Sequence, residues 1–576
     1  MCVTGLPGLQ QVSNFKRYEK RKKTTGVQID TMLELKNFTT PMLMPPSVSA
    51  LTTATSGVVS AAGSSSNSNY YKMICVPLDP IYSVEGVCLT GPMQVQWTGQ
   101  LAEMPKKFVL HGDGKHKLHH GKWVLITIGT HFLRWDAAHT TLSTSFAPLM
   151  YLMCKQVESK GACMMVLDGL NVLSLKYFGK PLDPGATMSD HSSGFKYGFT
   201  MTFSEAYFGQ CYPHIKRKWN EGEYCSKTFK HFDEAGDHIT LIHMAASEKM
   251  RDLLITEVGF VWDTWGKHMN TFWDSYCVSP WDNWSIGLFD CMLCTPSQQA
   301  QESWHKQLIQ TKIPNMMLGS TEYLFAETLP QLIEMDAIMI PTKLPFEVTN
   351  VPKGMMEKSL WYVEHQSSHV KAWKATDGSI CFFFLRKDNP GGWKKIDDRL
   401  IQMYQAALNG VKDKRIKTLD YLADLVNSIH LVADKTEPWG VPRCEANVGE
   451  FDCFGCKGFK AYGLCSHVLT INHIVKNINV RYELLQIGQA TTWNTQKAAP
   501  ALSKQPKPKA VKGPKAVKGK GKGKAKATAK PKPKGKGKAK MIQSDSSEEE
   551  YQEHYTFADS SDEEMEQALA LGQQGK

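Results

Sequence analysis

The sequence predicts an α/β fold, because strand-like and helix-like segments alternate along much of the chain. Residues 106–118 (KKFVLHGDGKHKL) and 121–133 (GKWVLITIGTHFL) are rich in apolar and β-branched residues and flank a glycine-containing turn, as adjacent strands do. Residues 150–173 predict a partly helical segment. Residues 184–192 (PGATMSDHS) predict a short strand that ends in an acidic residue.

The later part of the chain continues this mixture. Residues 294–313 predict a helix with Thr295 as the N-cap and Pro296 in the first turn, followed by good helix formers. Residues 379–387 (SICFFFLRK) have the composition of a strand. Residues 397–434 predict a largely helical region that is interrupted once at an Asn-Gly pair.

Size and composition limit the classes of protein to consider. The chain has 576 residues, 42% of them hydrophobic, which is enough for a sizeable core and two or three domains. No apolar run approaches the roughly 18 residues of a membrane helix, and the N-terminus does not have the pattern of a secretory signal. Without such a signal, the 15 cysteines indicate a reducing compartment, where clustered cysteines are metal ligands more often than disulfides.

Composition also predicts where the folded segments begin and end. We expect six segments: a disordered N-terminal segment with a basic cluster (1–70), an α/β core (71–330), a mixed strand and helical connecting region (331–439), a cysteine-rich segment (440–480), a lysine-rich disordered tail (495–540) and an acidic disordered C-terminus (541–576).

The cysteine-rich segment carries the clearest chemical signal. Within "CFGCKGFKAYGLCSHVL", Cys453 and Cys456 form a Cys-x-x-Cys pair, and Cys465 and His467 form a Cys-x-His pair that enters an apolar helix. Three thiolates and one imidazole match the tetrahedral preference of zinc and leave no open position, so the pattern predicts one structural zinc ion. Buried free cysteines that meet by coincidence are the plain alternative.

This segment resembles the SWIM-type zinc finger, in which a cysteine pair, a spacer with an aromatic residue and a glycine, and a Cys-x-His follow one another. Phe459, Gly463 and "CSHVL" fit that pattern. The first pair departs from it, because Phe454 occupies the position of the family's first cysteine and Cys453 stands one residue earlier.

SWIM fingers often follow the catalytic core of Mutator-like (MULE) transposases, and the upstream region resembles that core as well. The resemblance implies an RNase H-like fold, a mixed sheet with flanking helices. It also implies a catalytic Asp-Asp-Glu set in which the first Asp ends the first strand, the second follows the fourth strand and the Glu lies on a later helix. The matching blocks give Asp113, Asp190 and Glu302, and the family's Cys-x-x-His signature near the active site matches Cys211 and His214. Gln298 and Gln299 stand where the family has two asparagines.

Carboxylates suit the chemistry that this resemblance implies. Hydrolysis or transfer at a phosphodiester by two magnesium or manganese ions needs hard oxygen ligands that hold the metals about 3.5–4 Å apart. Each acid by itself could be an ordinary turn or helix-surface residue, and Asp168 is a rival acid. A second zinc site formed by Cys211, His214, Cys291 and Cys294 is a further alternative.

The tails predict contact with nucleic acid. Residues 501–540 contain 16 lysines and no acid, and this segment resembles the tails of linker histones. Such a segment neutralises phosphates without reading the base sequence. The acidic segment that follows could pair with these lysines or bind histones.

These observations lead to one main hypothesis and two alternatives. The main hypothesis is a nuclear, zinc-binding transposase of the DDE type that cleaves DNA and transfers the strand. The first alternative is a domesticated, catalytically inactive descendant that regulates chromatin through its finger and tail. The second is a nuclear zinc protein whose finger binds another protein. We expect DNA as the partner and no membrane association, and homo-oligomerisation stays open.

Overall fold

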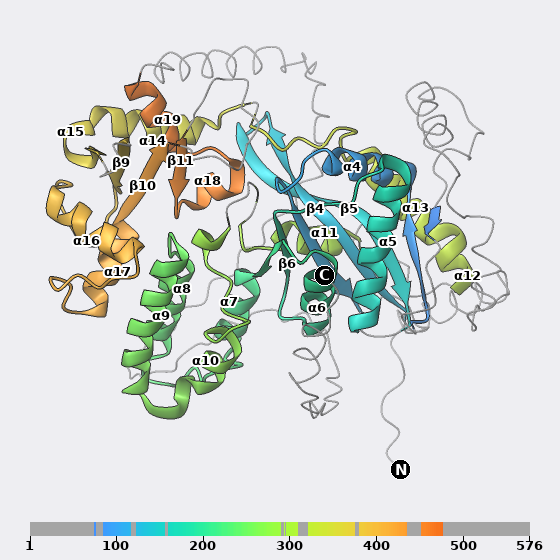
Figure 1. Cartoon of the computed structure of the whole chain (residues 1–576), viewed down its shortest axis with the longest axis horizontal. Coiled ribbons are helices and arrows are strands. Elements are labelled where there is room, and N and C mark those ends of the chain that lie inside the picture. Colours follow the sequence, from blue (N-terminus) through green and yellow to red (C-terminus); the bar gives the residue numbers. More distant parts are fainter. Residues whose placement is uncertain are drawn as a thin grey trace, which may run out of the picture. The chain divides into compact units, whose positions relative to one another are not determined.

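The structure is a computed structural model, and it describes the chain in separate stretches between residues 74 and 475 (Figure 1). These stretches are 74–76, 84–116, 123–155, 159–289, 293, 295–308, 321–348, 350–374, 380–434 and 451–475. The predicted segments 1–70, 495–540 and 541–576 lie outside the described residues, and so do Cys291 and Cys294.

A mixed seven-stranded sheet organises the first half of the described chain, and the predicted α/β fold is confirmed. Its strands, in spatial order, are β1 (Ile74–Val76), β2 (Gly86–Thr90), β5 (Thr141–Cys154), β4 (Val124–Asp136), β3 (Val109–Lys115), β6 (Ala186–Ser189) and β7 (Tyr207–Gln210). The pairs from β1 to β3 are antiparallel, whereas β6 runs parallel to β3 and β7 runs parallel to β6.

β3, β4 and β6 lie where the sequence predicted strands, whereas β5 was not predicted. Residues 150–154 of the segment predicted as partly helical belong to β5, and the helix of that segment, α5, begins at Lys160. β3 and β4 pair as neighbours, with Asp113 opposite Thr127. β6 ends at Ser189, so Asp190 follows it directly. Asp113 and Asp190 therefore lie on adjacent parallel elements of the sheet.

Helices cover both faces of this sheet. α4 (Pro92–Ala102), α5 (Lys160–Phe178) and α6 (Ser193–Thr202) share a core with Ile126 and Ile128 of β4. Leu125 of the same strand points to the other face, where it packs with Trp304 of α11 (Gln299–Gln307). The π-helical turn η7 (Leu324–Thr328) and α13 (Leu329–Met339) also pack on that face, and α12 (Thr321–Tyr323) directly precedes η7.

The predicted start of the helix at Thr295 is wrong, because α11 begins at Gln299. The preceding residues make other contacts: the carbonyl of Pro296 accepts a hydrogen bond from the Tyr212 amide at 2.8 Å, and the Gln298 amide donates to the Cys211 sulfur at 3.2 Å. These contacts engage the residues before Gln299 with the start of α7, so the helix begins later than predicted.

A helical region separates β7 from α11 in the sequence. It contains α7 (Tyr212–Glu221), α8 (Phe232–His243), α9 (Glu248–Asp263), η3 (Gly266–Met269), α10 (Asn270–Tyr276) and η4 (Ile286–Leu288). Its apolar side chains share a core with those of α16 (Asp398–Leu408) and α17 (Leu419–Ser428).

A second, antiparallel sheet joins the predicted connecting region to the cysteine-rich segment. Its order is β11 (Phe451–Phe454), β10 (Ile429–Asp434), β9 (Ile380–Leu385) and β8 (Val370–Lys374). α14 (Lys353–Glu364), α15 (Gln366–His369), α18 (Lys457–Tyr462) and α19 (Ser466–Ile474) complete this part. The cysteine-rich segment thus supplies one strand of a larger sheet. None of the helices in the described part of the chain has the length together with the hydropathy that a membrane span requires.

Candidate metal site and acidic cavity

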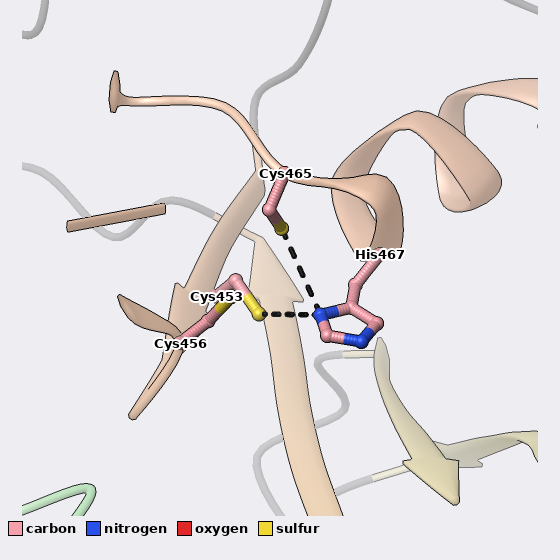
Figure 2. Close-up of side chains that lie close together, drawn as sticks. All are labelled: Cys453, Cys456, Cys465 and His467. Carbon is pink, nitrogen blue, oxygen red and sulfur yellow. Dashed lines mark hydrogen bonds between the residues drawn. The ribbon is translucent and has the colours of Figure 1, made fainter. Parts of the chain in front are cut away.

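The four residues predicted to bind zinc lie together (Figure 2). One ligand atom from each of Cys453, Cys456, Cys465 and His467 lies within 4.8 Å of the others, and all four side chains are buried. The sulfurs of Cys453 and Cys465 lie 3.5 Å and 3.8 Å from Nδ1 of His467. The predicted convergence of these residues is confirmed.

Short structural elements bring these side chains together. Cys453 lies on β11, where it pairs with Val432 of β10, and Cys456 immediately precedes α18. Gly455, between the two cysteines, has a φ of 65°, a left-handed conformation that glycine adopts without strain. Cys465 is the N-cap of α19, so its side chain and that of His467 project from the first turn of this helix. Cys453 is the member of the cluster on β11, and the neighbouring Phe454 is 36% exposed.

The surroundings of His467 fix the orientation of its ring. Nδ1 faces the sulfurs, while Nε2 lies 3.4 Å from the hydroxyl of Tyr362 on α14. The rings of His430 and Phe384 pack at centroid distances of 4.6 Å and 4.9 Å. A hydrogen-bond partner on the second ring nitrogen is what metal-binding histidines usually have.

The three thiols of the cluster interact electrostatically. Hydrogen bonds from Cys453, and then from Cys465, hold the pKa of the Cys456 thiol well below its ordinary value. Burial raises the pKa of Cys453 and of Cys465. Three sulfurs and one imidazole nitrogen from buried side chains are the donor set of structural zinc sites, so this cluster could bind a metal such as zinc.

A second candidate site is a cavity between β3 and α11 that is lined by both acidic and basic side chains. It has a volume of about 350 Å³ and lies against Asp113 and Glu302, two of the three predicted catalytic acids. Its lining residues are Asp113, Gly114, Lys115, His214, Arg217, Glu302, His305 and Lys306. The structure therefore brings together residues from β3, α7 and α11.

Each of these two acids has a histidine neighbour. Oδ2 of Asp113 lies 3.1 Å from Nδ1 of His305, and Oε1 of Glu302 lies 3.2 Å from Nε2 of His214. The second oxygen of Glu302 lies 3.7 Å from the guanidinium of Arg217. Burial lowers the pKa of His214, and the negative charge of Glu302 opposes that shift.

The third predicted acid, Asp190, is not among the residues that line the cavity. The amide of Cys211 donates to the carbonyl of Ser189, the residue before Asp190, at 3.0 Å. Burial raises the pKa of the Cys211 thiol to about 12, and the charges of Glu302 and Asp190 add to this effect. Cys211 therefore lies within electrostatic reach of both acids.

The rival acid Asp168 is elsewhere. It lies on α5, and its Oδ1 accepts a hydrogen bond of 3.4 Å from Thr202 of α6. α6 covers the sheet face opposite to α11, since a Cβ at Gly112 would lie 2.4 Å from Phe195 of α6. Asp168 and Asp113 therefore face different sides of the sheet.

Two glutamines hold α11 against the sheet. Nε2 of Gln298 donates to the carbonyls of Gly112 (2.8 Å) and Met188 (3.4 Å), and so connects β3 with β6. Nε2 of Gln301 donates to the carbonyl and the hydroxyl of Thr127, both at 3.1 Å. Neither role was predicted from the sequence, which indicated only that Gln298 and Gln299 stand where Mutator-like transposases have two asparagines.

In comparisons with known proteins, no family model matches this chain and no curated protein matches it significantly. The activity of the protein is therefore inferred from the side chains of the two sites described above. They define an α/β protein with a buried Cys₃His cluster and a separate cavity in which two acids, two histidines and several cationic side chains meet.

Proposed function

We propose that this protein is a Mutator-like transposase or a close descendant of one, with an RNase H-like core that cleaves DNA and transfers the strand. One observation carries the proposal. Asp113 lies on β3, Asp190 follows the adjacent parallel strand β6, and Glu302 projects from α11 into the cavity beside Asp113. Carboxylates at such positions can converge although they are far apart in the sequence.

The strand order supports the same proposal. Counted from β3, the chain forms three antiparallel strands, and β6, the fourth, returns parallel to β3 on its other side. The resemblance to Mutator-like transposases implies the first acid on the first strand and the second acid after the fourth, and Asp113 and Asp190 occupy these places.

The residues around the acids suit a phosphodiester substrate. Two divalent cations, magnesium or manganese, would supply activation of the attacking oxygen and stabilisation of the leaving oxygen. Asp113, Asp190 and Glu302 would hold them, with His305 orienting Asp113. Lys115, Arg217 and Lys306 line the same cavity and can contact the phosphates of the DNA backbone.

The Cys₃His cluster would then be a SWIM-type finger with a structural zinc ion. Its closed donor set has no position for a substrate, and it belongs to the same sheet as β8, β9 and β10. DNA binding would be strengthened by the lysines of residues 501–540, and the protein would act in the nucleus.

A second candidate function is that of a domesticated, inactive DNA-binding regulator. The observation that favours it is the pairing of Glu302 with both His214 and Arg217, at 3.2 Å and 3.7 Å. Cationic partners at this carboxylate compete with a metal ion for its oxygens.

Cleavage of a labelled DNA duplex bearing the terminal repeats that flank the coding region separates these two functions. The transposase should nick this duplex only with magnesium or manganese, and Asp113→Asn, Asp190→Asn and Glu302→Gln should each abolish nicking without loss of DNA binding. Asp168→Asn is the matched control and should remain active. If the wild-type protein binds DNA but shows no metal-dependent nicking, the inactive regulator is the better account.

A further inference from the structure

Cys211, His214 and Glu302 form a second cluster of metal-binding side chains, separate from the Cys₃His cluster. One ligand atom from each lies within 4.8 Å of the other two. We propose that these three residues bind a borderline divalent cation, of which zinc is the example, with the fourth coordination position open to the cavity. The binding of this cation does not depend on the proposed strand transfer.

The chain holds the donors in place without a metal. The Cys211 amide donates a hydrogen bond to the Ser189 carbonyl at the end of β6. The Cys211 sulfur accepts a hydrogen bond of 3.2 Å from the Gln298 amide. The Tyr212 amide bonds to the Pro296 carbonyl at 2.8 Å, so the start of α7 and the segment before α11 are tied together. Little rearrangement is then needed for the three side chains to share one ion.

His214 has the capacity to be a ligand. Its Nδ1 is buried and has no hydrogen-bond partner among the described residues, while its Nε2 faces Glu302. Either nitrogen of a neutral imidazole can bind a metal, and Nε2 already lies 3.2 Å from the Glu302 carboxylate. Binding would displace the Cys211 thiol proton into solvent, because the thiolate is the ligand.

The donor set selects the class of metal. One thiolate, one imidazole and one carboxylate suit zinc, whereas magnesium prefers oxygen ligands alone. Three protein ligands with an open fourth position are typical of zinc sites that bind water or substrate, in contrast to the closed Cys₃His cluster. His214 and Glu302 line the 350 Å³ cavity, which provides the space for that fourth ligand.

This site has a consequence that does rest on the proposed function. Glu302 belongs both to the zinc cluster and to the acids proposed to bind magnesium. Zinc bound here would withdraw Glu302 from the magnesium centre, so low zinc concentrations should inhibit magnesium-dependent nicking. The Cys211→Ser variant should resist this inhibition if it nicks DNA.

The direct test is the zinc content of the full-length protein after dialysis against a zinc-buffered solution. Cys211→Ser and Glu302→Gln should each contain one zinc ion fewer than the wild type. The matched control is Cys225→Ser, since Cys225 is also buried but belongs to neither cluster, and it should lose none. Unchanged zinc content in both Cys211→Ser and Glu302→Gln would overturn the proposal, whether or not the protein nicks DNA.

Two further measurements test which residues bind the ion. A Cys291→Ser/Cys294→Ser double variant should keep the ion; if this variant loses it while Glu302→Gln retains it, the ligand set proposed here is wrong. If Cys211→Ser fails to fold, cobalt is added to the folded wild type and to Glu302→Gln, with zinc already in the Cys₃His cluster. A sulfur-to-cobalt absorption band in the wild type that is weaker in Glu302→Gln supports the site, and equal bands or none refute it.

Discussion

His305 connects Asp113 to the neighbouring strand: its Nδ1 lies 3.1 Å from Asp113 Oδ2, and its Nε2 lies 3.2 Å from the hydroxyl of Thr127. Gln301 donates to the same hydroxyl at 3.1 Å. Gln301 and His305 of α11 therefore share the hydroxyl of Thr127 on β4, and His305 also contacts the carboxylate of Asp113. His305 is buried, and both His305 and Asp113 line the cavity.

From this arrangement we expect His305 to act as a positioning residue for Asp113. His305→Ala should lower metal-dependent nicking by about 10–100-fold, the range typical of partners that orient metal ligands. His305→Gln keeps a hydrogen-bond donor and should recover part of this loss. Nicking rates at several magnesium concentrations give the measurement, and equal rates for the alanine and glutamine variants would contradict a role in positioning.

The turn between Cys453 and Cys456 should tolerate no side chain at Gly455. This residue has a φ of 65°, and a Cβ there would lie 2.7 Å from the Cβ of Ala246, between α8 and α9. A non-glycine residue in such a conformation costs about 1–3 kcal/mol, and the close contact adds to that cost. Gly455→Ala should therefore lower both the midpoint of thermal unfolding and the affinity for zinc.

Gly458 provides the matched control for this turn. It lies in α18, and a Cβ there would have its nearest neighbours at 3.8 Å and 3.9 Å, which is ordinary contact. Alanine is favoured over glycine inside a helix by about 0.5–1 kcal/mol, so Gly458→Ala should be neutral or stabilising. Equal unfolding midpoints for the two alanine variants would show that the turn has no special requirement.

Local patterns predicted that the four residues of the Cys₃His cluster lie together, and they predicted the strands β3, β4 and β6, whereas long-range contacts were out of reach. Cys453 to His467 span a short segment whose spacing alone indicates a cluster, and Asp190 follows a strand visible in its composition. The contact of His305 with Thr127 joins residues 178 positions apart. No local pattern indicates that contact, nor that β11 would pair with β10 in a shared sheet. The start of α11 was misplaced for the same reason, since Cys211 and Tyr212 engage the residues before it.

Gln298 and Gln299 offer a test of how α11 is held, because adjacent glutamines have opposite environments. Gln298 is buried and donates to carbonyls on β3 and β6, whereas Gln299 is exposed. Removing the Gln298 amide leaves buried carbonyls without that donor, at a cost of about 1–3 kcal/mol. Gln298→Ala should therefore lower the free energy of unfolding measured in urea, and Gln299→Ala should change it little. Similar values for both variants would argue against this anchoring role.

The lysine-rich tail should contribute affinity for DNA without sequence preference. Residues 501–540 carry 16 lysines and no acid, and contacts between lysines and phosphates release counterions. Deleting these residues should weaken binding to every duplex by a similar factor and flatten the dependence of affinity on salt. Binding titrations at several salt concentrations measure this slope, and a slope that the deletion leaves unchanged would reject the role.

Removal of zinc should loosen the second sheet while leaving the first intact. The four ligands connect β11 to the start of α19, and Cys453 pairs with Val432 of β10. Structural zinc contributes about 10–16 kcal/mol of binding free energy in isolated finger peptides, and that energy is also folding energy. Cys456→Ser in the full-length protein should therefore lose the zinc ion of this cluster and lower the unfolding midpoint. Hydrogen exchange should accelerate in residues 451–475 and in β10, but not in α5 on the first sheet. The buried Cys225→Ser is again the control for loss of a thiol, and identical exchange in Cys456→Ser and Cys225→Ser would mean that the cluster does not hold a structural metal.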